Sequence, residues 1–198
     1  MLHFLTMADN RGPIRRYLRW WGQALRGRVR ISAYEAIDDP AALPDDTYIF
    51  GDGERLPPAG RARVDTIRAA LVSRGPRVRV LNDPRHQLRR RELLAALCAR
   101  GTNRFKAYGI DAPREPMRFP VFVRHVREHT GALSPLLENA TALEAAIAQL
   151  MATGHDATDL LIVEHLDTSV DGVFRKYAVL KIGPALLAHH IFFGTEWM

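Results

Sequence analysis

The sequence contains no long apolar run, no pair of cysteines and very little lysine. Its apolar runs, such as residues 160–163, fall far short of the ~20 residues that a membrane-spanning helix needs, so a membrane protein is not expected. Residues 1–7 lack the basic segment and the apolar core of a secretion signal. Cys98 is the single cysteine and cannot form an internal disulfide, so we expect a cytoplasmic protein.

Several well-known chemical motifs are also missing. The sequence has neither the Gly-x-Gly-x-x-Gly fingerprint of dinucleotide-binding proteins nor the phosphate-binding P-loop. No Cys/His spacing of a metal site occurs; His125 and His129 are four residues apart without a third ligand nearby, and a polar loop accounts for them. Ser134 does not lie in the strand–turn–helix setting of a hydrolase nucleophile. We therefore expect no metal ion bound by the chain's own residues.

The composition is that of a globular protein with an uneven charge distribution. Hydrophobic residues make up 47% and charged residues 25% of the 198 residues, enough for a packed core. Residues 1–118 hold 23 basic and 13 acidic residues, a net charge of +10, whereas the rest holds 5 and 9, a net charge of −4. The basic half either attracts an anionic partner or consists of solvated arginine-rich faces. Nucleic acid is the less favoured partner, because aromatic and basic residues are not interleaved.

The first hundred residues predict alternating strands and helices. Strands are expected at residues 2–6, 28–31, 47–50 and 77–81, and helices from Pro13 onward, at 62–72 and at 86–100. In the first helix, the spacing of Ile14, Tyr17, Leu18, Trp21 and Leu25 predicts a buried stripe. This order favours a small parallel sheet with helices on its faces, whose strand ends commonly bind ligands.

The second half predicts a different order of elements, with fewer helices. Residues 101–118 are expected to form a connector, followed by strands at 119–124, 160–165, 174–182 and 186–193. A helix is expected at 141–151, and another is expected to begin at Ser134 and Pro135. Gly183 and Pro184 predict that the last two strands form an antiparallel hairpin. The whole chain is thus expected to be α/β (α+β), with a parallel sheet followed by antiparallel strands.

Polar groups suited to a nucleotide follow the strands of the second half. Arg124 ends the first strand, and the stretch Glu164-His165-Leu166-Asp167 ends the next. Arg175 and Lys176 lie near the start of the hairpin. Cations bind phosphate oxygens through charge-assisted hydrogen bonds, strand-end backbone groups can read a base, and a carboxylate can hold ribose hydroxyls. This combination predicts a nucleotide site.

With these residues, the sequence resembles the ATP-grasp superfamily. The resemblance rests on residues 119–124, 160–167 and 174–183, supported by 81–84, 90–94 and 101–105, and covers about residues 45–198. It implies a pre-grasp domain with a Rossmann-like parallel sheet at 1–100, and a partial ATP-grasp domain with antiparallel strands at 101–198. It also implies ATP as the ligand. Complete relatives join a carboxylate to an amine or a similar nucleophile through an acyl phosphate.

The resemblance assigns roles to the polar residues named above. Arg124, where many relatives have lysine, would contact the nucleotide phosphates. The backbone of residues 164–166 would face adenine, and Asp167 would approach the ribose. Arg175 and Lys176 would point toward phosphates or an acyl phosphate, and either Arg104 or Lys106 would match an earlier basic residue of the family. The full set of expected nucleotide-binding residues is Arg104, Lys106, Arg124, Glu164, His165, Leu166, Asp167, Arg175 and Lys176.

Two simpler interpretations and one departure from the family remain. Glu164 can be a surface carboxylate at a strand end, and Arg124 can pair with Glu128. The magnesium ligands of ATP-grasp enzymes come after the hairpin, where Glu196 is the only acid beyond Lys181. The expectation is therefore a truncated ATP-grasp-like ligase of doubtful activity that binds ATP without an evident magnesium site. The alternative is a catalytically inactive binding or assembly module, in which exposed strand edges favour a homodimer.

Overall fold

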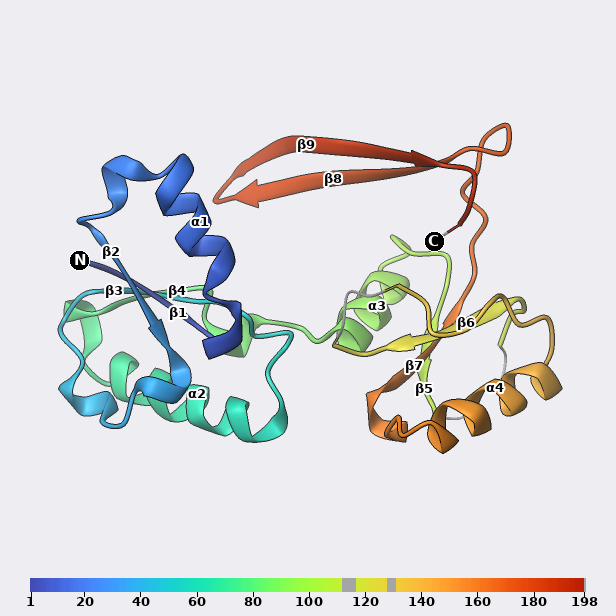
Figure 1. Ribbon diagram of the computed structural model, residues 1–198, viewed down its shortest axis with the longest axis horizontal. Helices are drawn as coiled ribbons and strands as arrows, with labels where there is room; N and C mark the ends of the chain where they lie inside the picture. The colour runs from blue at the N-terminus through green and yellow to red at the C-terminus, as the bar shows by residue number, and fades with distance from the viewer. Residues whose placement is uncertain (112–116, 128–130, 198) are drawn as a thin grey trace. The chain divides into compact units, whose positions relative to one another are not determined.

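The structure is a computed structural model that describes residues 1–111, 117–127 and 131–197 (Figure 1). The chain divides into two compact units, Met1–Arg90 and Arg91–Met198. None of the described helices is long and apolar enough to cross a bilayer. Seven short 3-10 helices join the main elements: η1 (Ala8–Asn10), η2 (Gln23–Leu25), η3 (Tyr34–Ala36), η4 (Pro40–Ala42), η5 (Gly75–Arg77), η6 (Pro84–His86) and η7 (Ala157–Asp159).

The first unit contains a four-stranded parallel sheet. Its strands are β1 (Leu2–Thr6), β2 (Val29–Ala33), β3 (Thr47–Phe50) and β4 (Arg79–Leu81), in the order β2-β1-β3-β4. Helices α1 (Gly12–Trp20) and α2 (Pro58–Val72) connect strands of this sheet. The expected fold class, a parallel α/β sheet followed by antiparallel strands, is confirmed.

Helix α2 packs its apolar face into the core of the first unit. Val64, Ile67 and Leu71 recur at helical spacing and are each at most 1% exposed. They belong to one cluster with strand residues such as Leu5 and Phe50. The sequence pattern that predicted this helix therefore also identified its buried face.

The expected buried stripe of α1 is wrong for Tyr17, Trp21 and Leu25, because Tyr17 is 42% and Leu25 39% exposed and Trp21 lies beyond the end of the helix. Of the α1 residues, Leu18 alone is buried, whereas Trp20 is 65% and Trp21 83% exposed. The helix ends at Trp20, and the amides of both Trp21 and Gly22 donate to the Tyr17 carbonyl, at 2.9 and 2.8 Å. The chain turns there, so Trp21 no longer continues the stripe that its spacing predicted.

The second unit contains a three-stranded antiparallel sheet. Strands β5 (Ala107–Gly109), β6 (Val121–His125) and β7 (Leu160–Glu164) lie in the order β5-β7-β6. Helices α3 (Arg90–Ala99) and α4 (Ala140–Ala152) precede β5 and β7 in the chain. The central strand β7 is buried along its whole length, and Leu160 and Ile162 pack with Leu143 and Ile147 of α4. The sequence missed β5, which lies inside the expected connector.

The two last strands form a separate two-stranded sheet. Strands β8 (Phe174–Ile182) and β9 (Ala185–Gly194) pair antiparallel, with an irregularity at Ala178/Val179. Gly183 adopts φ +56°, which a glycine tolerates in the turn. Figure 1 shows this hairpin as a long ribbon. The helix expected to begin at Ser134 is absent; the Ser134 hydroxyl instead accepts the Val123 amide at 2.9 Å.

Candidate functional site

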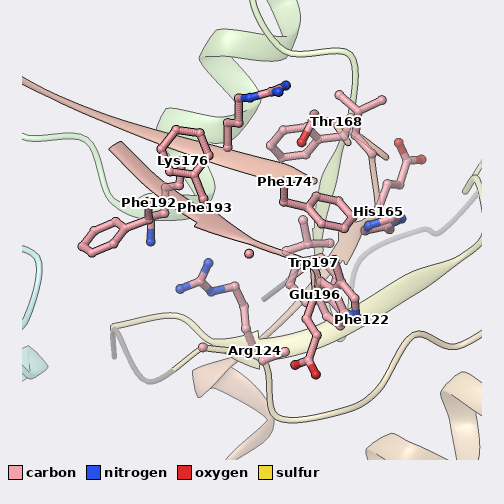
Figure 2. Close-up of a pocket in the computed structure, with 18 residues that line it drawn as sticks. Phe122, Arg124, His165, Thr168, Phe174, Lys176, Phe192, Phe193, Glu196 and Trp197 are labelled. Carbon is pink, nitrogen blue, oxygen red and sulfur yellow. The ribbon is translucent and has the colours of Figure 1, made fainter. Parts of the chain in front are cut away.

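A cavity of about 720 Å³ lies in the second unit where β7 ends. Its walls come from β6, from β7 and the residues after it, from the hairpin β8–β9 and from the segment after β9. Figure 2 shows side chains from these elements gathered around it. The volume lies within the range of roughly 300–1,000 Å³ that is typical of small-molecule sites.

Six of the nine residues expected to bind nucleotide line this cavity. They are Arg124, Glu164, His165, Leu166, Arg175 and Lys176. These residues are up to 52 positions apart in the sequence, and the antiparallel pairing of β6 with β7 explains why the first four meet. The other three expected residues, Arg104, Lys106 and Asp167, are not among the lining residues.

The cationic part of the lining comes from two different sheets. Arg124 lies on β6, and Arg175 and Lys176 lie on β8. Figure 2 shows the Arg124 side chain extending from β6 toward the hairpin. Among the described residues that line the cavity, Glu164 and Glu196 are the acids. Since the Glu164 carboxylate already accepts hydrogen bonds from protein groups, the cavity suits an anionic ligand.

The opposite part of the lining is aromatic. The ring of Trp197 lies 4.8 Å from that of Phe122 and 5.5 Å from that of His165, tilted by 51° and 77°. Figure 2 shows these three side chains close together. Sequence reasoning missed Phe122 and Trp197 as site residues. For Phe122 a signal existed, because it alternates with the buried Val121 and Val123 and therefore faces the other side of the sheet. For Trp197 the sequence offered none.

Glu164, at the end of β7, is buried, and its carboxylate accepts hydrogen bonds from residues in or next to β5 and from the segment that leads into β6. Its Oε1 accepts the Arg118 amide and the Tyr108 hydroxyl, each at 2.9 Å. Its Oε2 accepts the Lys106 amide at 2.9 Å and the Arg118 guanidinium at 3.0 and 3.3 Å. Burial alone would raise the pKa of Glu164, but the amides of Arg118 and Lys106 together with the two side chains lower it below its ordinary value.

The interpretation of Glu164 as a surface carboxylate is therefore wrong, since the residue is only 2% exposed. Its own amide donates to the Lys106 carbonyl at 3.0 Å, and the amide of His165 donates to the Pro120 carbonyl at 2.9 Å. The backbone from Glu164 to His165 is thus anchored on both sides. This anchoring fixes the segment that forms one wall of the cavity.

The three expected residues outside the lining have other surroundings. Lys106 contributes its backbone to the Glu164 interactions, and the Arg104 carbonyl accepts the Arg118 guanidinium. Asp167 is exposed and accepts the Ser169 amide at 2.8 Å, and the hydrogen bonds from Ser169 lower its pKa. Nucleotide roles for these three residues stay predictions.

The described residues do not fit a magnesium ion. Within the described ranges, no group of three or more His, Cys, Asp or Glu is arranged to hold a metal. Of the two acids that line the cavity, Glu164 uses both oxygens on N–H and O–H donors. The other, Glu196, stands alone as a hard-oxygen ligand, whereas magnesium sites combine several oxygen ligands. Glu128 and His129, named in two of the sequence interpretations, lie outside the described residues.

Comparisons with known proteins gave structural neighbours only. No family model and no curated protein sequence matches the chain. The crystal structure of the D-cycloserine synthetase DcsG is similar at a TM-score of 0.45 and 17% identity, covering 82% of this chain and 58% of that one. The D-alanine–D-alanine ligase from Bacillus anthracis is similar at a TM-score of 0.47 and 10% identity, covering 100% and 71%.

Both neighbours are ATP-grasp enzymes, the superfamily that the sequence resembles. This chain spans 58% of the length of the synthetase. At these TM-scores neither likeness bears on the chemistry, which rests on this chain's own residues.

Proposed function

We propose that the second unit binds ATP in the cavity at the end of β7. The proposal rests on the lining of one cavity of nucleotide size. Three cations, a wall of aromatic side chains and a strand end held by backbone hydrogen bonds all line this cavity. These three features match the three parts of a nucleotide. The phosphates are anionic, the base is flat and aromatic, and its edge carries hydrogen-bonding groups.

Arg124, Arg175 and Lys176 would hold the phosphates. Arginine offers a planar set of donors that fits phosphate oxygens, and lysine offers a compact charge. The cations approach from β6 and from β8, so a polyphosphate would contact both sheets of the unit. Asp167, Arg104 and Lys106 are kept as secondary candidates for ribose and phosphate contacts.

The base would lie against the wall formed by Phe122, His165 and Trp197. Aromatic rings favour offset-stacked or edge-to-face contacts, which a purine can join. The backbone at residues 164–166 would read the edge of the base. The hydrogen bonds of Glu164 and His165 to neighbouring chain segments hold this backbone in place before the ligand arrives, which lowers the entropic cost of binding.

Binding, rather than ligation, is the function that the described residues support. The carboxylate–amine ligation that the resemblance implies passes through phosphoryl transfer, in which magnesium neutralises the phosphates. The described donor set does not fit that ion, so we derive no catalytic step from it. A nucleotide-binding or assembly module is therefore the form of the proposal that these residues support, and ATP-dependent ligation is the second candidate.

The test uses the fluorescence of Trp197, which lines the cavity. Replacing the exposed Trp20 and Trp21 by phenylalanine leaves Trp197 as the single tryptophan of the chain. ATP, ADP, AMP and inorganic triphosphate are titrated with and without Mg²⁺. We expect ATP to change the Trp197 emission, and AMP to bind more weakly because it presents fewer charges to the cations.

A matched pair of variants on one strand localises the phosphate contacts. Lys176→Ala removes a cation that lines the cavity, and Lys181→Ala removes a cation of the same strand that does not. A charge-assisted hydrogen bond contributes about 1.5 kcal/mol, so Lys176→Ala should weaken ATP binding about tenfold. Lys181→Ala should leave it within about twofold. No ATP binding at millimolar concentration, or equal losses in the two variants, would refute the proposed site.

A further inference from the structure

The hairpin β8–β9 exposes far more apolar surface than a free hairpin normally does. Nine large apolar side chains on it are between 47% and 70% exposed. They are Tyr177, Val179, Leu180, Ile182, Leu186, Leu187, Ile191, Phe192 and Phe193. With full areas of roughly 150–250 Å² each, they leave on the order of 800 Å² exposed. Tyr177 and Ile191 share one face and Leu180 and Leu187 share the other, so this area divides into about 400 Å² on each face, a size at which an exposed patch is often functional.

The hairpin also has too few strands for an independent sheet. A two-stranded hairpin is marginally stable in water, and three or more strands are normally needed. Of the described strands, β8 and β9 pair only with each other, and all ten residues of β9 are exposed. The backbone groups on the outer edge of β9 therefore form a template for another strand.

The two edges of the hairpin differ in charge. Strand β8 carries Arg175, Lys176 and Lys181, the kind of charges that prevent edge-to-edge pairing. Strand β9 contains no Asp, Glu, Lys, Arg or Pro in its ten residues. Apart from His189 and His190 at its middle, where the pairing with β8 shifts register, β9 is apolar, and an edge without proline fits a partner strand of the same character. The chain itself supplies such a strand, namely β9 of a second copy.

We propose that two copies of this chain associate by antiparallel pairing of their β9 strands. The product is a four-stranded sheet in the order β8-β9-β9-β8, with a two-fold axis at the centre of β9. Each outer edge is then the cationic β8, so that repulsion between lysines and arginines stops further growth. The pairing satisfies the backbone groups on both β9 edges and raises the number of strands from two to four, above the three that an independent sheet normally needs.

The test compares two lysine substitutions at one position along the hairpin. Tyr177 and Ile191 are direct cross-strand partners, so they share one face of the hairpin, and they are 65% and 48% exposed. Ile191→Lys places a charge on the pairing strand, and Tyr177→Lys places the same charge on the same face of the other strand. The oligomeric state of each full-length protein is measured by sedimentation equilibrium over a hundredfold concentration range.

We expect the wild-type chain and Tyr177→Lys to form dimers, and Ile191→Lys to raise the dissociation constant at least tenfold. A wild-type monomer at all concentrations overturns the proposal. Equal loss in both variants overturns the edge pairing, since it would mean that the face makes the contact. Assembly beyond a dimer overturns the closed sheet.

Hydrogen exchange provides a second readout that needs no variant. In the wild-type chain, amides of β9 should gain protection as the protein concentration rises, whereas the outer amides of β8 should not. Protection that is independent of concentration in both strands would count against the dimer even if Ile191→Lys failed to fold. Both experiments are done without nucleotide, so their outcome does not depend on whether the cavity binds ATP.

Discussion

Glu164→Gln removes the charge of the buried carboxylate while keeping its shape. Glutamine replaces one acceptor oxygen by an NH2 donor. If the remaining oxygen faces the Lys106 amide and the Arg118 guanidinium, the NH2 group faces the Arg118 amide and the Tyr108 hydroxyl. The hydroxyl can rotate and accept, but the amide cannot. The substitution therefore leaves one buried N–H opposite another donor.

The cost follows from these contacts. Leaving one buried donor unsatisfied costs about 1–3 kcal/mol, and hydrogen bonds to a charged group are about twice as strong as those to a neutral one. The Arg118 side chain is 63% exposed and recovers hydration, which limits the loss. We expect Glu164→Gln to lower the free energy of unfolding by about 3 kcal/mol, at the low end of the range for a broken buried pair.

Urea unfolding followed by Trp197 fluorescence, with Trp20 and Trp21 replaced by phenylalanine, reports on the second unit. At an m-value of about 1.5 kcal/mol per M, the midpoint should fall by about 2 M. Arg118→Ala is the matched control: it keeps the Arg118 amide on Glu164 and removes the exposed guanidinium. Because the guanidinium is exposed although Glu164 is buried, water can replace part of its contacts, and the control should shift the midpoint by clearly less than Glu164→Gln does, by about 1 M at most.

The stability that the Glu164 carboxylate contributes should decrease at acidic pH. Because the folded state lowers the pKa of Glu164, its contribution is complete above the ordinary carboxyl pKa and is lost as pH falls through the lowered value. The stability difference between wild type and Glu164→Gln should therefore shrink at acidic pH. A difference below 0.5 kcal/mol at pH 7, or one that grows as pH falls, would refute this account of Glu164.

Two further predictions concern the cores of the units. Arg68 lowers the pKa of Asp83 to about 2, so Asp83→Asn should cost the first unit about 2 kcal/mol at neutral pH. The difference in urea unfolding should shrink as pH falls from about 4 through 2, and a difference at pH 2 as large as that at pH 7 would contradict it. Leu143 is 1% exposed, so Leu143→Ala should lower the free energy of unfolding, measured in urea, by about 3 kcal/mol. Met151 on the same helix is 50% exposed, so Met151→Ala should lower it by less than about 1 kcal/mol, and similar losses in the two variants would contradict the assigned core.

Local periodicity predicted most elements of the fold. Strand β3 at residues 47–50 and strand β8 at 174–182 agree with the predicted bounds, because β-branched and aromatic residues end there at glycine-containing turns. Helix α4 was predicted within one residue, although Asn139 forms the cap by accepting the Ala142 amide at 3.0 Å. The errors at Trp21 and Ser134 have different causes. At Trp21 the helix ends through bonds to its own Tyr17 carbonyl, whereas at Ser134 a hydrogen bond from the Val123 amide of a neighbouring strand replaces the helix that local sequence favoured.

The site was predictable where polar residues lie at the boundaries of predicted strands. Arg124 and the stretch from Glu164 to Leu166 lie at strand ends, Arg175 and Lys176 lie near the start of the hairpin, and all of them line one cavity. The interactions of Glu164 could not be predicted, because Arg118 and Tyr108 lie in the expected connector, 46 and 56 positions away. Such contacts depend on the order of strands in the sheet, which periodicity does not specify. For the same reason the aromatic wall at Trp197 was missed.

The cavity and the hairpin are physically connected through Lys176. Strand β8 contributes Arg175 and Lys176 to the cavity, and along its length it pairs with β9, the strand that the proposed dimer uses. No backbone hydrogen bond between the described parts of the hairpin and the β5-β7-β6 sheet joins the two sheets. A polyanion held by both Arg124 and Lys176 would therefore link the two sheets by charge. Because β9 is paired to β8 on both sides of the irregularity at Ala178/Val179, any ligand that orders β8 also orders the edge offered to a second copy. The two proposals thus predict that ATP binding and dimerisation favour each other, by the reciprocity that holds for any two linked equilibria.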